Sequence, residues 1–161
     1  MQKLFSDLEG LRIAMAIEER GRDFYRKAYD NVQKEEHKAV FLLLMNEEIH
    51  HYETFNNLFE RLQLSKEAHT EDYLFDQEIS RYLTVLAEGH VFPGKVQKEI
   101  NFASIADILE TAVQAEKDSV LFYDELARHS KFDNAKAVFT QLKTEEQTHI
   151  VKLREIAEGW A

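Results

Sequence analysis

Apolar and polar residues follow one another along most of this chain with the period of an α-helix. The pattern is clearest over residues 35–64, where the predicted inward face is Phe41, Leu44, Glu48, His51, Phe55, Leu58 and Leu62. Steps of three and four residues separate these positions, which is the spacing of one helical face. A carboxylate and an imidazole therefore stand on a face that is otherwise apolar. Because a buried carboxylate without a partner is costly, we expect a compensating group beside them.

The second half of the chain repeats this arrangement at a constant offset of 98 residues. The related pairs are Glu18 and Glu116, Phe24-Tyr25 and Phe122-Tyr123, Glu48 and Glu146, and His51 and His149. One offset across two helices and their connection indicates a duplicated helical hairpin. Glu47 and His50 also have Glu-x-x-His spacing, but Thr148 stands where His50 would recur. We therefore place Glu48 and His51, and not Glu47 and His50, on the inward face.

The same reading predicts an all-α single domain over residues 1–161, with helical hairpins at about 7–64 and 104–158. Ser6-x-x-Glu9 is a capping box for the first helix, and Ser104 is placed to cap the third. Asp133-Asn134 is predicted to cap the fourth. Gly159 suits the position after its end, with Trp160 as an apolar partner of that cap.

Residues 65–101 are not duplicated and form an insert of about 37 residues. This is too long for a tight hairpin and long enough to travel the length of a bundle, roughly 30 Å. We therefore expect a four-helix bundle whose second and third long helices are parallel and joined by a long crossover. A short helix is predicted at 76–88 and a turn at 91–94.

The insert is rich in apolar residues, namely Tyr73, Leu74, Phe75, Tyr82, Val91 and Phe92. A crossover lying on one bundle cannot easily hide them all, and large exposed apolar patches usually mark contacts. We therefore expect a homo-oligomer, with a dimer favoured. The alternative is that these residues cap the end of their own bundle.

The amino-acid composition excludes several kinds of metal site and argues against several kinds of partner and location. The chain has no cysteine, which excludes disulfides, thiolate zinc sites, iron–sulfur clusters and rubredoxin-type iron. A net charge of −10 makes nucleic acid an unexpected partner. No apolar run approaches the roughly 18 residues of a membrane span, and the N-terminal residues lack the apolar core of a secretory signal. A cytoplasmic location is the expectation.

Each of the four long helices is thus predicted to carry one inward glutamate, and two of them add a histidine: Glu18, Glu48, His51, Glu116, Glu146 and His149. A bundle with this donor set is the design of dinuclear iron and manganese carboxylate proteins. Four carboxylate charges balance two divalent ions, and hard oxygen donors with imidazole suit iron or manganese. The alternative is that the glutamates are surface residues and the histidines ordinary core polar groups.

Glu18 with Phe24-Tyr25, followed by the two Glu-x-x-His pairs and Glu116, resembles the ferritin-like superfamily, and most closely the stand-alone rubrerythrin-type diiron domains. This resemblance implies two iron ions, with manganese or zinc as substitutes. It makes Glu18 and Glu116 terminal ligands, Glu48 and Glu146 bridging ligands, and gives each metal one histidine. Tyr25 and Tyr123 either hydrogen-bond ligands of the opposite pair or are ordinary core tyrosines.

The resemblance implies redox chemistry on O2 or H2O2, as an oxidase, peroxidase or ferroxidase, with an electron donor that the sequence does not identify. The sequence departs from typical rubrerythrins in two respects, which limit what the resemblance implies. Typical rubrerythrins carry a further glutamate one turn after the third-helix ligand, where Ser119 stands here, and a rubredoxin domain, which a chain without cysteine cannot contain. The alternatives are iron binding and storage, or an interaction protein that a metal braces without turnover.

Overall fold

Four long helices form the bundle of the computed structural model, which describes residues 4–88 and 100–159. They are α1 (Asp7–Asn31), α2 (Glu35–Gln63), α4 (Ile105–His129) and α5 (Asp133–Ala157). A shorter helix, α3 (Gln77–Glu88), and two single 3-10 turns, η1 (Glu67–His69) and η2 (Glu71–Tyr73), lie between α2 and α4. The predicted all-α class is confirmed, and each long helix begins and ends within a residue or two of the prediction.

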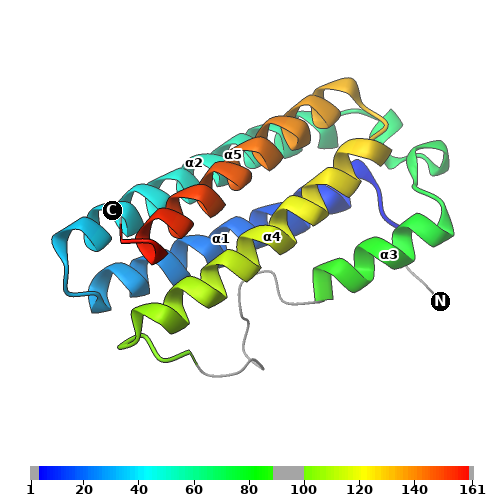
Figure 1. The fold of residues 1–161 in the computed structure, drawn as a ribbon. Helices are drawn as coiled ribbons and strands as arrows, with labels where there is room; N and C mark the ends of the chain where they lie inside the picture. Colours follow the sequence, from blue (N-terminus) through cyan, green and yellow to red (C-terminus); the bar gives the residue numbers. More distant parts are fainter. Residues whose placement is uncertain (1–3, 89–99, 160–161) are drawn as a thin grey trace.

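The bundle consists of two antiparallel hairpins, α1 with α2 and α4 with α5, packed against each other (Figure 1). Figure 1 also shows α2 and α4 running in the same direction, so the predicted crossover is confirmed. After α2 the chain turns back at one end of the bundle, and α3 returns alongside α4. The predicted turn at 91–94 and the predicted packing of Trp160 lie outside the described residues.

Local signals account for three ends of the long helices: the starts of α1 and α4 and the end of α5. The hydroxyl of Ser6 accepts a hydrogen bond from the Glu9 N–H at 3.2 Å, and Ser104 accepts one from Asp107 at the same distance. Gly159 has φ +79°, the left-handed conformation that ends a helix and that glycine adopts without strain.

The predicted cap of α5 is wrong. Its N-cap residue is Phe132, with no side-chain cap, and the side chain of Asn134 accepts only from the neighbouring Ala135 N–H. The free N–H groups of Lys131 and Phe132 instead donate to Asp7 Oδ2, each at 3.0 Å. The carboxylate at the start of α1 thus binds the two backbone N–H groups that directly precede α5, including that of its N-cap residue.

Part of the insert packs on its own bundle. Phe75 is buried, and its N–H donates to the Phe5 carbonyl at 2.8 Å. The ring of Tyr73 stacks on Phe132 with 4.8 Å between centroids. These two aromatic residues therefore follow the alternative in which the insert covers the bundle end. Tyr82 stays 43% exposed, and Val91 and Phe92 lie outside the described residues.

No helix in the described part of the chain combines the length and the apolar character needed to cross a membrane.

Candidate metal centre

The inward face of α2 is the one predicted: its buried residues are Phe41, Leu44, Glu48, His51, Phe55, Leu58 and Leu62. The polar pair lies in the middle of that face, between apolar residues on either side. The repeat places Glu146 and His149 in the same way on α5. Glu18 on α1 and Glu116 on α4 complete the set, and all six side chains are essentially inaccessible to solvent.

Aromatic rings enclose this polar centre within the bundle. Phe55 packs against Tyr123 and Phe139, with centroids 5.3 and 5.6 Å apart, and Tyr25 stacks on Phe41 at 6.1 Å. Because all five rings are buried, the centre lies in a medium of low dielectric constant. Charges there interact more strongly than at the surface, and an uncompensated charge is correspondingly costly.

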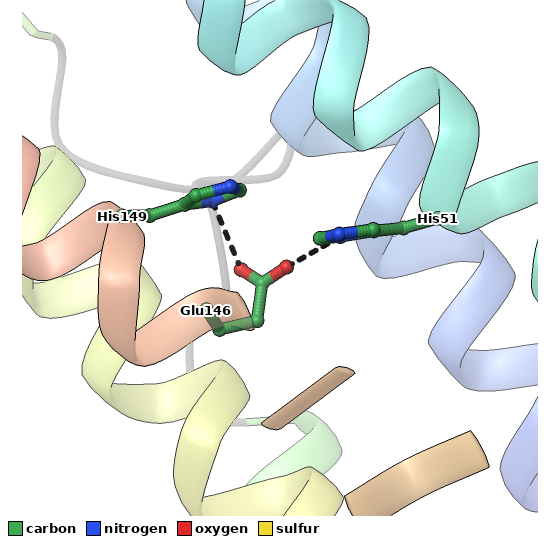
Figure 2. A group of neighbouring side chains, drawn as sticks. All are labelled: His51, Glu146 and His149. Carbon is green, nitrogen blue, oxygen red and sulfur yellow. Dashed lines mark ion pairs between the residues drawn. The ribbon is translucent and has the colours of Figure 1, made fainter. Parts of the chain in front are cut away.

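Glu146 lies between the two imidazole rings (Figure 2). Its Oε1 is 2.7 Å from His51 Nδ1, and its Oε2 is 3.6 Å from His149 Nδ1. The two rings are nearly parallel, with centroids 5.5 Å apart and an interplanar angle of 10°. One carboxylate therefore contacts the histidines of both hairpins, which is the position that a bridging group between two ions requires.

Besides the trio His51, Glu146 and His149, the six residues form two overlapping four-donor groups, each with its donor atoms within 4.8 Å of one another. The first group is Glu18, Glu48, His51 and Glu146, and the second is Glu48, Glu116, Glu146 and His149. Glu48 and Glu146 belong to both groups, whereas each of the other residues belongs to one. The geometry therefore offers two adjacent four-donor positions with two shared carboxylates.

Two tyrosines hold the unshared glutamates from across the bundle. The Tyr25 hydroxyl on α1 donates to Glu116 Oε1 on α4 at 2.5 Å, and the Tyr123 hydroxyl on α4 donates to Glu18 Oε1 on α1 at 2.8 Å. Each tyrosine thus belongs to one hairpin and its glutamate to the other. The two bonds fix one oxygen of each glutamate, and the second oxygen of each is buried without a hydrogen bond.

Protons partly compensate the carboxylates in the absence of cations. Burial and the nearby carboxylate of Glu146 together raise the pKa of Glu116 to about 8. Burial lowers the pKa of His51, but the carboxylates of Glu146 and Glu18 outweigh burial and raise it to about 11. The pKa of His149 is raised for the same reason by Glu116 and Glu146. The centre therefore holds protons that a cation would displace.

The donor atoms fit metal ions. Carboxylate oxygens of Glu18, Glu48, Glu116 and Glu146 lie buried without a well-formed hydrogen bond, as do the ring nitrogens of His51 and His149. Buried polar atoms in folded proteins are nearly always hydrogen-bonded, so a cluster of this size needs another partner. Four carboxylates and two imidazoles would balance two divalent cations in charge and donor type.

Two further glutamates are neighbours of the centre: Glu47, which the sequence interpretation placed off the inward face, and Glu145, which it did not consider. Glu47 Oε2 lies 3.1 Å from His149 Nε2, and Glu145 Oε1 lies 3.6 Å from His51 Nε2. Neither belongs to a four-donor group. A signal was present in the sequence, because Glu145 repeats Glu47 at the same offset of 98 as the inward residues.

Comparison with known proteins agrees with this architecture. The family model described as Rubrerythrin matches residues 9–90 and 107–160. A solved structure from Thermotoga maritima, of a candidate ferritin-like diiron-carboxylate protein, superimposes with a TM-score of 0.71 at 22% identity over 97% of each chain. CopM in its Cu(II)-bound form superimposes with a TM-score of 0.64 at 12% identity over 100% of each chain. No curated protein matches the chain.

The two solved structures share the fold, and the family match covers both hairpins together with α3, including all six inward residues. The chain therefore belongs to the rubrerythrin family of diiron-carboxylate proteins.

Proposed function

We propose that Glu18, Glu48, His51, Glu116, Glu146 and His149 hold two iron ions, and that this pair carries out redox chemistry on O2 or H2O2. The observation that carries the proposal is the pair of four-donor groups that share Glu48 and Glu146. Membership of the rubrerythrin family supports iron as the metal, and hard carboxylate donors with one imidazole for each ion suit it. Manganese and zinc are the substitutes that the same donors accept.

Each type of residue has a distinct part in this proposal. Glu18 and Glu116 are terminal ligands, and their tyrosine hydrogen bonds keep one oxygen aligned while the other is free to bind. Glu48 and Glu146 bridge the two positions and keep the ions close together. His51 and His149 supply one neutral nitrogen to each ion. When bound, an iron pair supplies two electrons for reduction of the oxidant, one from each Fe(II).

Buried aromatic residues set the environment of that chemistry. Phe41, Phe55 and Phe139 are inaccessible to solvent and pack against Tyr25 or Tyr123, the tyrosines that hydrogen-bond the terminal glutamates. They limit the water around the ligands, which disfavours replacement of a carboxylate by water on its cation. This arrangement favours a centre that keeps its metal through oxidation and reduction over one that passes metal onward.

Metal analysis with single-turnover kinetics tests the proposal. The purified chain is analysed for iron, manganese, zinc and copper, copper being included because one structural neighbour was solved with it. The apo protein is then loaded anaerobically with Fe(II) and mixed with O2 or H2O2 in a stopped-flow spectrometer. We expect about two irons for each chain. At least one of the two oxidants should oxidise the bound Fe(II) completely in a single mixing experiment.

Two results would favour the alternatives. Accumulation of many irons for each chain in a large assembly would indicate storage. Retention of the metal pair with no oxidation by either oxidant would indicate a metal that braces the bundle, especially if the apo form keeps its helical content. A chain that binds no transition metal at micromolar concentration would contradict the proposal outright.

A further inference from the structure

Both imidazoles have one nitrogen toward the centre and the other toward the outside of the bundle. His149 Nδ1 lies 3.5 Å from Glu48 Oε1 and 3.5 Å from Glu116 Oε1. Its Nε2 faces the other way and lies 3.1 Å from Glu47 Oε2. The ring therefore offers Nδ1 to the second four-donor group, and its remaining nitrogen contacts a carboxylate outside that group.

The first hairpin shows the same arrangement. His51 Nδ1 lies 2.7 Å from Glu146 Oε1, and its Nε2 lies 3.6 Å from Glu145 Oε1. Glu47 is on α2 and contacts the histidine of α5, whereas Glu145 is on α5 and contacts the histidine of α2. Each imidazole is thus contacted on its outer side by a carboxylate of the opposite hairpin.

Exposure distinguishes Glu47 from an ordinary surface residue. The side chains of Glu47 and Glu145 are 34% and 36% exposed, while the two imidazoles are at most 1% exposed. Oε2 of Glu47, the oxygen that faces His149, is itself buried. A solvated surface carboxylate would have both oxygens in water. Glu47 instead extends one oxygen into the bundle wall, where the ring nitrogen is the partner at hand.

We propose that Glu47 and Glu145 are positioning residues, each of which holds the imidazole of the opposite hairpin with Nδ1 directed at the metal. This inference rests on the proposed function, because it concerns ligands of the proposed ions. A carboxylate can only accept a hydrogen bond, so it selects the tautomer that carries its proton on Nε2. The lone pair is then on Nδ1, which is the nitrogen that faces the carboxylates of the centre.

A specific consequence follows from the crossed arrangement. Glu47 supports the ion held by Glu116 and His149, although it is adjacent in sequence to a residue of the other group. Glu145 supports the ion held by Glu18 and His51. Loss of Glu47 should therefore weaken one metal position, and loss of Glu145 the other. Stoichiometry at saturating metal should stay at two, since neither residue is itself a ligand.

Variants that retain one metal position allow this consequence to be tested with Zn(II) as the probe. Glu18→Ala removes a ligand of the first metal position and retains only the second, which includes His149. In that background Glu47→Ala should lower the Zn(II) affinity by about 10- to 100-fold, the usual effect of losing such an outer partner. Glu145→Ala should change it little. In a Glu116→Ala background, which leaves the position with His51, the two effects should exchange.

Two controls separate positioning from loss of folding. Glu53→Ala removes an exposed glutamate from the same helix and should leave both affinities unchanged. Glu47→Gln keeps a hydrogen-bond acceptor without the charge, so it should recover part of the affinity that Glu47→Ala loses. A general destabilisation of α2 would weaken both metal positions equally and would not be relieved by glutamine.

The fully loaded chain gives a second measurement that needs no ligand deletion. In the ¹⁵N NMR spectrum of the Zn(II)-loaded protein, Glu47→Ala should shift the His149 ring nitrogens and speed exchange of the Nε2 proton, while His51 stays unchanged. Equal affinity of Glu47→Ala and its parent, with unshifted His149 nitrogens, would overturn the inference and leave the metal centre standing. Failure of the unmodified chain to bind Zn(II), Mn(II) or Fe(II) would overturn both.

Discussion

The sharing of Glu48 between two donor groups leads to a prediction about metal stoichiometry. Glu18 belongs to one group and Glu48 to both. Glu18→Ala should therefore reduce the metal content from about two ions to about one for each chain. The position that remains keeps three carboxylates and His149. Glu48→Ala should weaken both positions, because each loses one of its four donors.

The size of the affinity loss in Glu48→Ala follows from the charge balance of the centre. The intact centre sets four carboxylates against two divalent cations, and Glu48→Ala leaves one positive charge uncompensated in a fully buried place. Removing one partner of a buried ion pair costs about 3–5 kcal/mol. At about 1.4 kcal/mol for each tenfold change, this lowers the affinity for the second ion by roughly two to four orders of magnitude. At micromolar metal, Glu48→Ala should therefore appear nearly empty of the second ion.

Equilibrium dialysis against Mn(II) or Zn(II), followed by elemental analysis, measures both quantities. Glu19→Ala is the matched control, because Glu19 is exposed on the same helix as Glu18 and should leave two ions bound. Far-UV circular dichroism establishes that each variant is folded. Glu18→Ala should hold its remaining ion at an intact four-donor position, whereas Glu48→Ala leaves two three-donor positions. Equal affinity for the remaining ion in the two variants would refute the division into two positions with shared carboxylates.

Three further predictions concern pH, redox geometry and assembly. Glu116 has a pKa of about 8 and must lose its proton to bind a cation, so metal affinity should rise between pH 6 and pH 9. Calorimetry in buffers of different ionisation enthalpy measures the protons that are released on binding. Ser119 is buried and cannot replace a carboxylate, so both irons should stay in place in crystals of oxidised and reduced protein; Ser119→Glu should add a ligand and favour peroxide over O2. The dimer remains a prediction: sedimentation at micromolar concentration should give a dimer, and Tyr82→Glu, on the exposed side of α3, should shift it toward monomer.

The raised pKa values also give the metal-free protein an unusual dependence on pH. His51 keeps its proton in the folded state up to about pH 11 and would lose it near 6.5 when unfolded. The folded state therefore binds more protons in this interval, and stability falls as pH rises through it, by up to about 1.4 kcal/mol per pH unit for one proton. Urea denaturation of chelator-treated protein at pH 7 and pH 9 should show this loss, and His51→Asn should reduce it. The exposed His50 provides the control, since His50→Asn should leave the loss unchanged.

Local sequence signals were enough to predict the helices and the inward residues. The face of α2 was predicted residue by residue, because burial on a long helix depends on a periodicity that the sequence shows directly. The caps at Ser6 and Ser104 involve residues three apart, and Gly159 needs only its own conformation. Duplication added what one hairpin could not, since it selected Glu48 over Glu47.

Contacts between the two hairpins could not be predicted from local sequence signals. The cap of α5 was predicted from Asp133-Asn134, but its partner is Asp7, more than 120 residues away in the chain. The contact of Glu47 with His149 likewise depends on how far the hairpins are rotated against each other. A helical period fixes which residues share a face, and it does not fix which residues of another helix lie opposite the edge of that face.

Each hairpin contributes three residues to one donor group and lends a single glutamate to the other. A lone hairpin would hold an incomplete site, whereas two identical hairpins related by a twofold axis across the bundle would complete two sites at once. A peptide half as long as this chain could thus have bound a metal pair as a symmetric homodimer. Hairpins related in this way point in opposite directions. The end of the first hairpin, at α2, and the start of the second, at α4, therefore lie at opposite ends of the bundle (Figure 1). Fusing the two copies then required a connection as long as the bundle itself, which accounts for residues 65–101 without assigning them any part in the chemistry.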